Sequence, residues 1–242
     1  MLEFEDFVYL DVQKTGSTTI RRFLSKFART GVISDAKHEP VERRDDSKLY
    51  LISCRDPLKQ YLSLYSHGNS NKGGLRGRMN TAGMSHLYDG THEGFVSWLE
   101  LLLDPVESQK YLLKKDNHRI LDFLGLLTLR FLTLAFASPL EVFETLHNKN
   151  DVKERFKTDS LYSVLLKTET LTDDLNKLVT GEHSKIFKRR HAAEAFLAKD
   201  RRKNVSTNPG IDLKALSPEL ISRVQEREWL YFDELGYAPY IS

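Results

Sequence analysis

The chain has only one cysteine, Cys54, among its 242 residues, so it cannot form an intrachain disulfide. A lone cysteine favours a reducing compartment, which predicts a cytoplasmic location, although it is also compatible with an oxidising one. The first six residues carry three acidic side chains and no basic segment, unlike a signal peptide. The longest apolar stretch, residues 121–137, is interrupted by Asp122 and Arg130. We expect no transmembrane segment, because this stretch is too short and too polar to span a bilayer.

The chain also has little excess of either charge. It carries 36 basic and 34 acidic residues, for a formal net charge of +2. This balance argues against a protein whose main partner is nucleic acid. Any anion site must therefore come from a local cluster. Hydrophobic residues make up 40% of the chain and charged residues 29%, as in ordinary globular proteins. Neither the composition nor the charge predicts an oligomeric state.

The order of the elements predicts a single α/β domain over residues 1–242, with a mostly parallel central sheet flanked by helices. Strands are expected at residues 7–12, 49–54 and 161–166, and the first two are each followed by a helix. Asp56 and Pro57 suit the start of the second helix, and Ser217 that of the last. Residues 69–83, rich in glycine, predict a mobile loop. Further helices are expected at residues 18–29, 91–103, 107–124, 139–147, 170–179 (capped by Thr172), 185–203 (basic, ending as a loop) and 217–235.

The first functional motif lies between the first strand and its helix. It is the run Lys14, Thr15, Gly16, Ser17, Thr18 and Thr19. At a helix N-terminus, backbone N–H groups and the helix dipole favour anions. Gly16 permits close approach of a ligand to the backbone, the hydroxyls add donors, and Lys14 adds a full charge. The motif therefore predicts a phosphate or sulfate site. A Walker A loop instead begins with glycine and has its lysine late, which disfavours a standard ATP or GTP site.

The second motif follows the strand at residues 49–54. Arg55 directly precedes the expected helix, and Ser63 lies eight residues later. Eight residues cover about two helical turns, so Arg55 and Ser63 can face the same side. A guanidinium and a hydroxyl that converge suit a phosphate monoester.

The two motifs in this order resemble those of PAPS-dependent sulfotransferases, especially the carbohydrate-type branch. PAPS is 3′-phosphoadenosine 5′-phosphosulfate. The resemblance implies a P-loop-like fold, with residues 14–19 on the 5′-phosphosulfate and with Arg55 and Ser63 on the 3′-phosphate. It implies transfer of the sulfuryl group to a hydroxyl or amine of an acceptor such as a glycan, without a metal. Two positions depart from the family: Gln13 replaces a proline, and Gln60 a second arginine for which Lys59 is an alternative.

Sulfuryl transfer also needs a base that removes a proton from the acceptor. Asp35, His38 and Glu39 follow the first helix, in a stretch that can return to the sheet edge where sites of open α/β folds form. The family uses either histidine or glutamate here. We favour His38, because histidine titrates near neutrality whereas Glu39 needs a raised pKa. A solvated charged turn is the structural alternative, and His67 and His118 are alternative bases.

A late basic segment includes Lys185, Lys188, Arg189, Arg190, Arg201, Arg202 and Lys203. The resemblance implies that Arg202 and Lys203 close over the nucleotide. The same segment also suits an anionic acceptor, or simply a solvated helix. Two other functions stay open at this point: a small-molecule kinase, and a binding module for nucleotides or polyanions without catalysis. No cluster in the sequence has the spacing of metal ligands.

Overall fold

The structure is a computed structural model that describes residues 1–112, 120–199 and 210–241. The chain forms two compact units, each assembled from three stretches. The first unit comprises Met1–Arg55, Phe131–Val142 and Arg155–Val205. The second comprises Asp56–Arg130, Phe143–Glu154 and Ser206–Ser242. The candidate residues are therefore divided, because Arg55 belongs to the first unit and Ser63 to the second.

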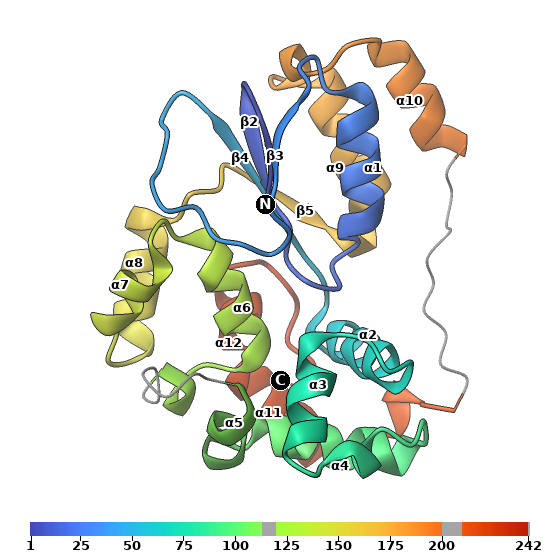
Figure 1. Ribbon diagram of the computed structural model, residues 1–242, viewed down its shortest axis with the longest axis vertical. Coiled ribbons are helices and arrows are strands. Elements are labelled where there is room, and N and C mark those ends of the chain that lie inside the picture. Colours follow the sequence, from blue (N-terminus) through green and yellow to red (C-terminus); the bar gives the residue numbers. More distant parts are fainter. Residues whose placement is uncertain (113–119, 200–209, 242) are drawn as a thin grey trace. The chain divides into compact units, whose positions relative to one another are not determined.

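The first unit is built on a five-stranded sheet with the order β3-β1-β2-β4-β5 (Figure 1). The three strands β2 (Phe7–Leu10), β4 (Leu49–Cys54) and β5 (Val164–Lys167) are parallel. The two strands β1 (Leu2–Phe4) and β3 (Val32–Asp35) pair antiparallel beside them. The α/β class and the parallel pairing of the three predicted strands are confirmed, whereas β1 and β3 were not predicted.

Three helices of the first unit lie on one face of this sheet (Figure 1). They are α1 (Ser17–Phe27), α9 (Leu171–Thr180) and α10 (Arg190–Lys199). On α1, Ile20, Phe23, Leu24 and Phe27 repeat at helical spacing and are all buried. They join a core that also contains Phe4, Phe7 and Leu51 from the strands and Leu175 and Leu178 from α9. Burial of this apolar face fixes α1 against the sheet and so fixes the position of its N-terminus.

The second unit is helical among its described residues. It contains α2 (Pro57–Asn69), α3 (Gly74–Thr81), α4 (His92–Leu103), α5 (Pro105–Leu112), α11 (Pro218–Arg227) and α12 (Trp229–Asp233). The side chains of Asp56, Thr91 and Ser217 cap the helices α2, α4 and α11 by accepting backbone hydrogen bonds. These caps confirm the predicted starts at Asp56 and Ser217.

Three more helices have residues in both units, because the boundaries between the units fall within them. They are α6 (Leu126–Ala135), α7 (Pro139–Glu144) and α8 (Lys149–Asp159). The short 3-10 turns lie at Ser85–Leu87, Ile120–Asp122, Thr168–Thr170, Ser184–Ile186 and Leu213–Ala215. No helix in residues 1–112, 120–199 and 210–241 is long and apolar enough to cross a membrane.

Three local predictions were wrong. Residues 69–83 contain the helix α3, because Leu75 and Met79 lie four residues apart and are both buried. The cap of α9 is at Thr170 rather than Thr172. The Asp174 carboxylate accepts hydrogen bonds from the Thr170 hydroxyl and the Lys167 N–H, which favours this earlier start. The helix expected at residues 107–124 includes Ile120–Asp122, which is a 3-10 turn, whereas α5 is described up to Leu112 and residues 113–119 lie outside the described residues.

The second unit is held together by the carboxylate of Glu228, which is fully buried. It accepts hydrogen bonds from the Tyr61 hydroxyl, from the Leu127 N–H, and from both the N–H and the hydroxyl of Thr128. Burial raises the pKa of Glu228. Four donors offset much of the cost of burying the group. The carboxylate joins α2 and α6 to the end of α11, which lie far apart in sequence.

Gly125 makes room for this carboxylate. A Cβ atom at residue 125 would lie 2.1 Å from Oε1 of Glu228, which its four hydrogen bonds hold in place. We therefore expect Gly125→Ala to lower the free energy of unfolding by roughly 1–3 kcal/mol. Gly77→Ala is the matched control, because a Cβ there has no neighbour within 4 Å and alanine favours the helix α3. Urea unfolding followed by circular dichroism tests both. Equal stability of the two variants would contradict this role of Glu228.

Candidate functional site

The loop between β2 and α1 has two residues in the left-handed region of backbone conformation. Lys14 has φ 66° and Gly16 has φ 82°. Glycine adopts this region readily, but for lysine it costs on the order of 1–2 kcal/mol. Left-handed residues turn neighbouring N–H groups toward one side of the chain, which is the geometry of anion-binding nests. The loop therefore has the backbone form that the sequence motif predicts.

A chain of three buried hydroxyls ties this loop to the neighbouring strand. The Thr15 hydroxyl donates to the Val12 carbonyl oxygen at 2.7 Å and lies 2.6 Å from Ser53 Oγ. Ser53 Oγ in turn lies 2.7 Å from the Tyr9 hydroxyl. Because Thr15 has given its only proton to Val12, Ser53 must donate to Thr15 and Tyr9 to Ser53. The Thr15 hydroxyl therefore has no proton left to donate to a bound anion. Of the donors of Thr15, only the backbone N–H can serve that purpose.

The N-terminus of α1 has no side-chain cap and no acidic residue in its first turn. Its N-cap is Gly16, whose carbonyl accepts from the Thr19 and Ile20 N–H groups. The first N–H groups of a helix have no acceptor within the helix. In α2, α4 and α11 a side chain supplies one, whereas α1, like α3 and α9, has no side-chain cap. The hydroxyls of Ser17, Thr18 and Thr19 lie in this same first turn.

Lys14 and Arg55 lie next to each other at the carboxyl ends of β2 and β4. Nη1 of Arg55 donates to the Lys14 carbonyl oxygen at 3.4 Å. The Lys14 ammonium has no hydrogen bond or ion pair in the described part of the chain. Partial burial and the charge of Arg55 both lower the pKa of Lys14. An anion bound here would relieve the repulsion between the two cations, so this is the strongest electrostatic sign of an anion site in the first unit.

His38 is anchored to Asp11, the residue that follows β2. Its backbone N–H donates to the Asp11 carboxylate at 3.0 Å, and its Nδ1 lies 2.6 Å from the Asp11 carbonyl oxygen. A carbonyl oxygen only accepts, so Nδ1 must carry the proton. In neutral His38 the lone pair is therefore on Nε2. The side chain is 35% exposed, which leaves it accessible to a ligand.

Asp11 itself is fully buried and is held by Arg21 of α1. Nη1 of Arg21 lies 3.0 Å from Asp11 Oδ2, and Nη2 contacts Asp35. This pair links α1, the end of β2 and the segment that carries His38. The sequence analysis missed Asp11 and Arg21, although a charged residue within an apolar strand-like run and a basic residue on a buried helix face were visible signals.

Glu39 does not share this anchorage. Its side chain is exposed, and its backbone N–H bonds to the Ala36 carbonyl oxygen. The described contacts therefore favour His38 over Glu39 as the group that is held in a fixed position. His67 lies on α2 in the second unit, and His118 lies outside the described residues.

The predicted convergence of Arg55 and Ser63 stays a prediction, because they belong to different units. Ser63 is buried on α2, with 4% of its surface exposed. Gln60, at the position of the family's second arginine, is fully buried and accepts a hydrogen bond from the Tyr231 hydroxyl at 3.3 Å. That contact gives Gln60 a role in the packing of the second unit. Lys59 is exposed on the same helix.

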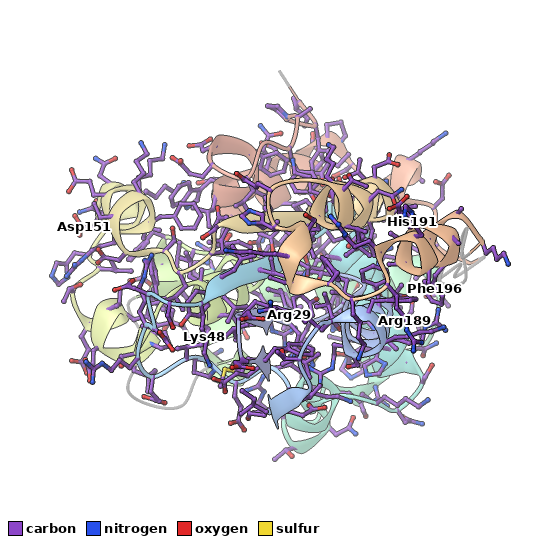
Figure 2. All side chains as sticks on the ribbon, turned by 90° about the horizontal axis from the view of Figure 1, so that it is seen from above. Arg29, Lys48, Asp151, Arg189, His191 and Phe196 are labelled. Carbon is purple, nitrogen blue, oxygen red and sulfur yellow. The ribbon has the colours of Figure 1, made fainter. Side chains whose placement is uncertain are left out.

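The late basic segment is described only in part, because Arg201, Arg202 and Lys203 lie outside the described residues. The exposed side chains of Lys185, Lys188, Arg189 and Arg190 belong to the turn before α10 and to its first residue. Figure 2 shows Arg189, His191 and Phe196 of this region. Lys26 of α1 lies 4.7 Å from the centre of the Phe196 ring and Arg22 lies 5.4 Å from it, so α1 adds two cations to the same surface.

A cavity of about 520 Å³ lies elsewhere in the first unit. It is lined by Arg29 and Lys48, both labelled in Figure 2, and by Asp6, Ser47, Leu49, Ser163, His183, Lys185 and Ile186. Asp6, Leu49 and Ser163 mark the amino ends of β2, β4 and β5, whereas Lys14 and Arg55 follow carboxyl ends. The cavity is therefore at the opposite edge of the sheet. Within the described ranges, no group of histidine, cysteine or acidic residues could hold a metal ion.

The described site thus brings together the loop at Lys14, the open N-terminus of α1, Arg55 and His38, all in the first unit. It offers positive charge, backbone donors and one anchored imidazole. The first three groups can bind an anion, and His38, anchored to Asp11 three residues before Lys14, can accept a proton. No protein-family model, curated protein or solved structure matches this chain.

Proposed function

We propose that this protein is a sulfotransferase that moves the sulfuryl group of PAPS to a hydroxyl or amine of an acceptor, most simply a carbohydrate. The observation that carries the proposal is the pair of cations, Lys14 and Arg55, at the uncapped N-terminus of α1. Phosphate and sulfate groups are the ligands that such an arrangement binds best. The order of the motif, with lysine first, supports PAPS over ATP.

The donor fits the residues present. The loop at residues 14–19 offers backbone N–H groups, hydroxyls and the Lys14 ammonium to a phosphosulfate. Arg55 is the described side chain for the 3′-phosphate, and Ser63 its predicted companion. Arg202 and Lys203 remain proposed contacts from the resemblance alone. PAPS already carries its leaving group, so the reaction as proposed requires cations rather than a metal.

In the proposed reaction, the acceptor oxygen or nitrogen attacks the sulfur atom of PAPS. A new bond to sulfur forms, and the bond from sulfur to the bridging oxygen of the 5′-phosphate breaks. The negative charge that grows on this phosphate is largest in the transition state. Lys14 and the N–H groups of α1 neutralise it there, as preorganised donors do in other transfer enzymes. The product nucleotide is PAP, adenosine 3′,5′-bisphosphate.

His38 is the proposed general base. Its Nε2 atom takes the proton that the acceptor loses as the new bond forms, and it later releases this proton to water. Asp11 keeps Nδ1 protonated and thereby keeps the lone pair on Nε2. Arg21 acts through Asp11 and is a positioning residue.

The first prediction is that the protein binds PAP more tightly than AMP, which lacks only the 3′-phosphate. We expect a difference of roughly 10–100-fold by calorimetry, since a guanidinium contributes about 1.5–3 kcal/mol per hydrogen bond to a charged group. Arg55→Gln should remove the preference, whereas Arg44→Gln, at an exposed arginine, should keep it. ATP that binds as tightly as PAP would favour a kinase instead.

The second prediction concerns turnover. Lys14→Ala should lower kcat by about 10²–10³-fold, by comparison with other deleted transition-state donors, and should change the affinity for PAP much less. Lys14→Gly should lose as much, although glycine suits the positive φ at this residue. Lys26→Ala, on the last turn of the same helix, is the control. A raised KM with unchanged kcat would mean that Lys14 only binds the ground state.

The third prediction is that His38→Ala lowers kcat by about 10²–10⁴-fold and leaves the affinity for PAP nearly unchanged. The acidic limb of the pH–rate profile should also disappear in this variant. Glu39→Gln is the matched control and should stay active. The opposite pattern would assign the base to Glu39. Full activity of both variants, with PAP still bound, would overturn the role of this turn.

A further inference from the structure

A second cationic cluster lies in the second unit, around Tyr88. The Tyr88 ring packs against Tyr65 and Trp98, with ring centres 5.4 and 5.9 Å apart. The guanidinium carbon of Arg76 lies 4.6 Å from the centre of the Tyr88 ring. Arg130 of α6 is close enough to Tyr88 for its charge to lower the pKa of the Tyr88 hydroxyl, although burial raises that pKa overall. Three polar side chains from distant segments thus meet in one aromatic environment.

Each of these side chains has a buried donor without an acceptor in the described part of the chain. They are Nη1 of Arg130, Nε of Arg76 and the hydroxyl of Tyr88, whose hydrogen-bonding neighbour in the described contacts is the Trp98 indole N–H. Arg76 does use Nη1, which donates to the Ser85 carbonyl oxygen at 2.9 Å. The Trp98 indole can only donate, so it provides no acceptor for the Tyr88 proton. All three positions therefore have a proton to donate and no acceptor for it.

The charge of the cluster is also uncompensated. Burial lowers the pKa of Arg130 to about 10, and the neighbouring charge of Arg78 contributes to this. The other groups facing Arg130 are the phenols of Tyr61, Tyr88 and Tyr231, which are neutral. Neither Arg76 nor Arg130 forms an ion pair with a carboxylate among the described residues. Both arginines are only partly buried, but each has a buried N–H without an acceptor, and a cation with neither a counter-charge nor a full set of acceptors is costly.

The donors of this cluster indicate what kind of ligand would bind there. It must accept several hydrogen bonds, carry negative charge and reach donors on α3, on α6 and on Tyr88. A tetrahedral oxyanion meets these conditions, since guanidinium groups pair with its oxygens. A neutral ligand would leave the charge of Arg130 uncompensated.

We propose that Arg76, Tyr88 and Arg130 form a binding site for a sulfate or phosphate group, either as the free ion or at the end of a larger ligand. The site shares no residue with the proposed donor site, and its existence does not depend on the proposed function. Arg78 adds positive charge beside it.

The test is a titration with sodium sulfate at low millimolar concentration, against sodium chloride of equal ionic strength. Tryptophan fluorescence is measured in a Trp229→Phe background, so that the signal comes from Trp98 next to Tyr88, and thermal unfolding gives a second signal. The parent is the full-length protein with Lys14→Ala and Arg55→Gln together, which removes both described cations of the Lys14 loop, so that sulfate at this loop contributes little. We expect a saturable response to sulfate in this parent and none to chloride. No saturable response would overturn the proposal.

Arg130→Gln, added to the parent, should weaken sulfate binding at least about tenfold. Arg223→Gln is the matched control, because it removes a positive charge from a partly exposed arginine of the same unit, and binding should persist. Tyr88→Phe keeps the ring and removes only the hydroxyl, so it decides the case if Arg130→Gln fails to fold. It should weaken sulfate binding by about tenfold as well. Affinity equal to that of the parent in the folded variants would contradict the assignment.

A last arm distinguishes the two sources of the anion. A sulfated monosaccharide and a phosphorylated one are titrated in the same way as inorganic sulfate. Tighter binding of either monoester, lost with Arg130→Gln, supports a site for the charged end of a larger ligand. Equal affinity for the free ion supports a site for inorganic sulfate or phosphate. If the parent does not bind sulfate, the proposed site around Arg130 is wrong. The predictions of PAP binding and turnover, which test the proposed function, are unaffected by that result.

Discussion

The candidate site depends on the chain of hydroxyls that joins Tyr9, Ser53 and Thr15. It crosses from β2 to β4 at the ends of two parallel strands and fixes the direction of each proton in turn. Because these atoms are buried, an unpaired hydroxyl there would cost on the order of 1–3 kcal/mol. The loop after β2 is therefore held against β4, and Lys14 is held beside Arg55. Packing and hydrogen bonds between uncharged groups therefore keep Lys14 and Arg55 close together despite their mutual repulsion.

Two residues of the site adopt backbone conformations that are unfavourable for their side chains. Lys14 and His38 both have positive φ, at 66° and 61°. The strain at His38 is offset by two hydrogen bonds to Asp11, and Asp11 is fixed by its ion pair with Arg21. Strain that surrounding contacts enforce is common where a group must be held ready for a ligand.

The predictable parts of this fold were those in which local sequence and tertiary packing agree. β4 has an apolar run bounded by polar residues, and α2 and α11 begin with a capping side chain followed by proline, so their starts follow from local chemistry. β1 and β3 contain only three and four residues, and β3 is held in the sheet by its pairing with β1, which itself pairs with β2. The sequence of β1 and β3 contains no local pattern that predicts a strand. α3 was likewise hidden, since its glycines suggest a loop and only the burial of Leu75 and Met79 makes it a helix.

The site itself was predictable in its charged residues and not in the contacts that hold them. Lys14, Arg55 and His38 carry chemistry that the sequence exposes directly. Asp11, Arg21 and Ser53 act through partners 10 to 44 residues away, and no spacing rule connects them. The cluster around Arg130 was even harder to predict from the sequence. Its three side chains come from separate segments, and only the structure shows that they share a lack of hydrogen-bond acceptors. Glu228, buried in the second unit, has four donors. Arg227 of the same unit also has an unpartnered Nε, but its other nitrogens donate to three carbonyl oxygens, so the case for Arg130 depends on its place beside Tyr88 and Arg78. Within that unit, several donors without acceptors in one place are therefore a better guide to a ligand than a buried charge as such.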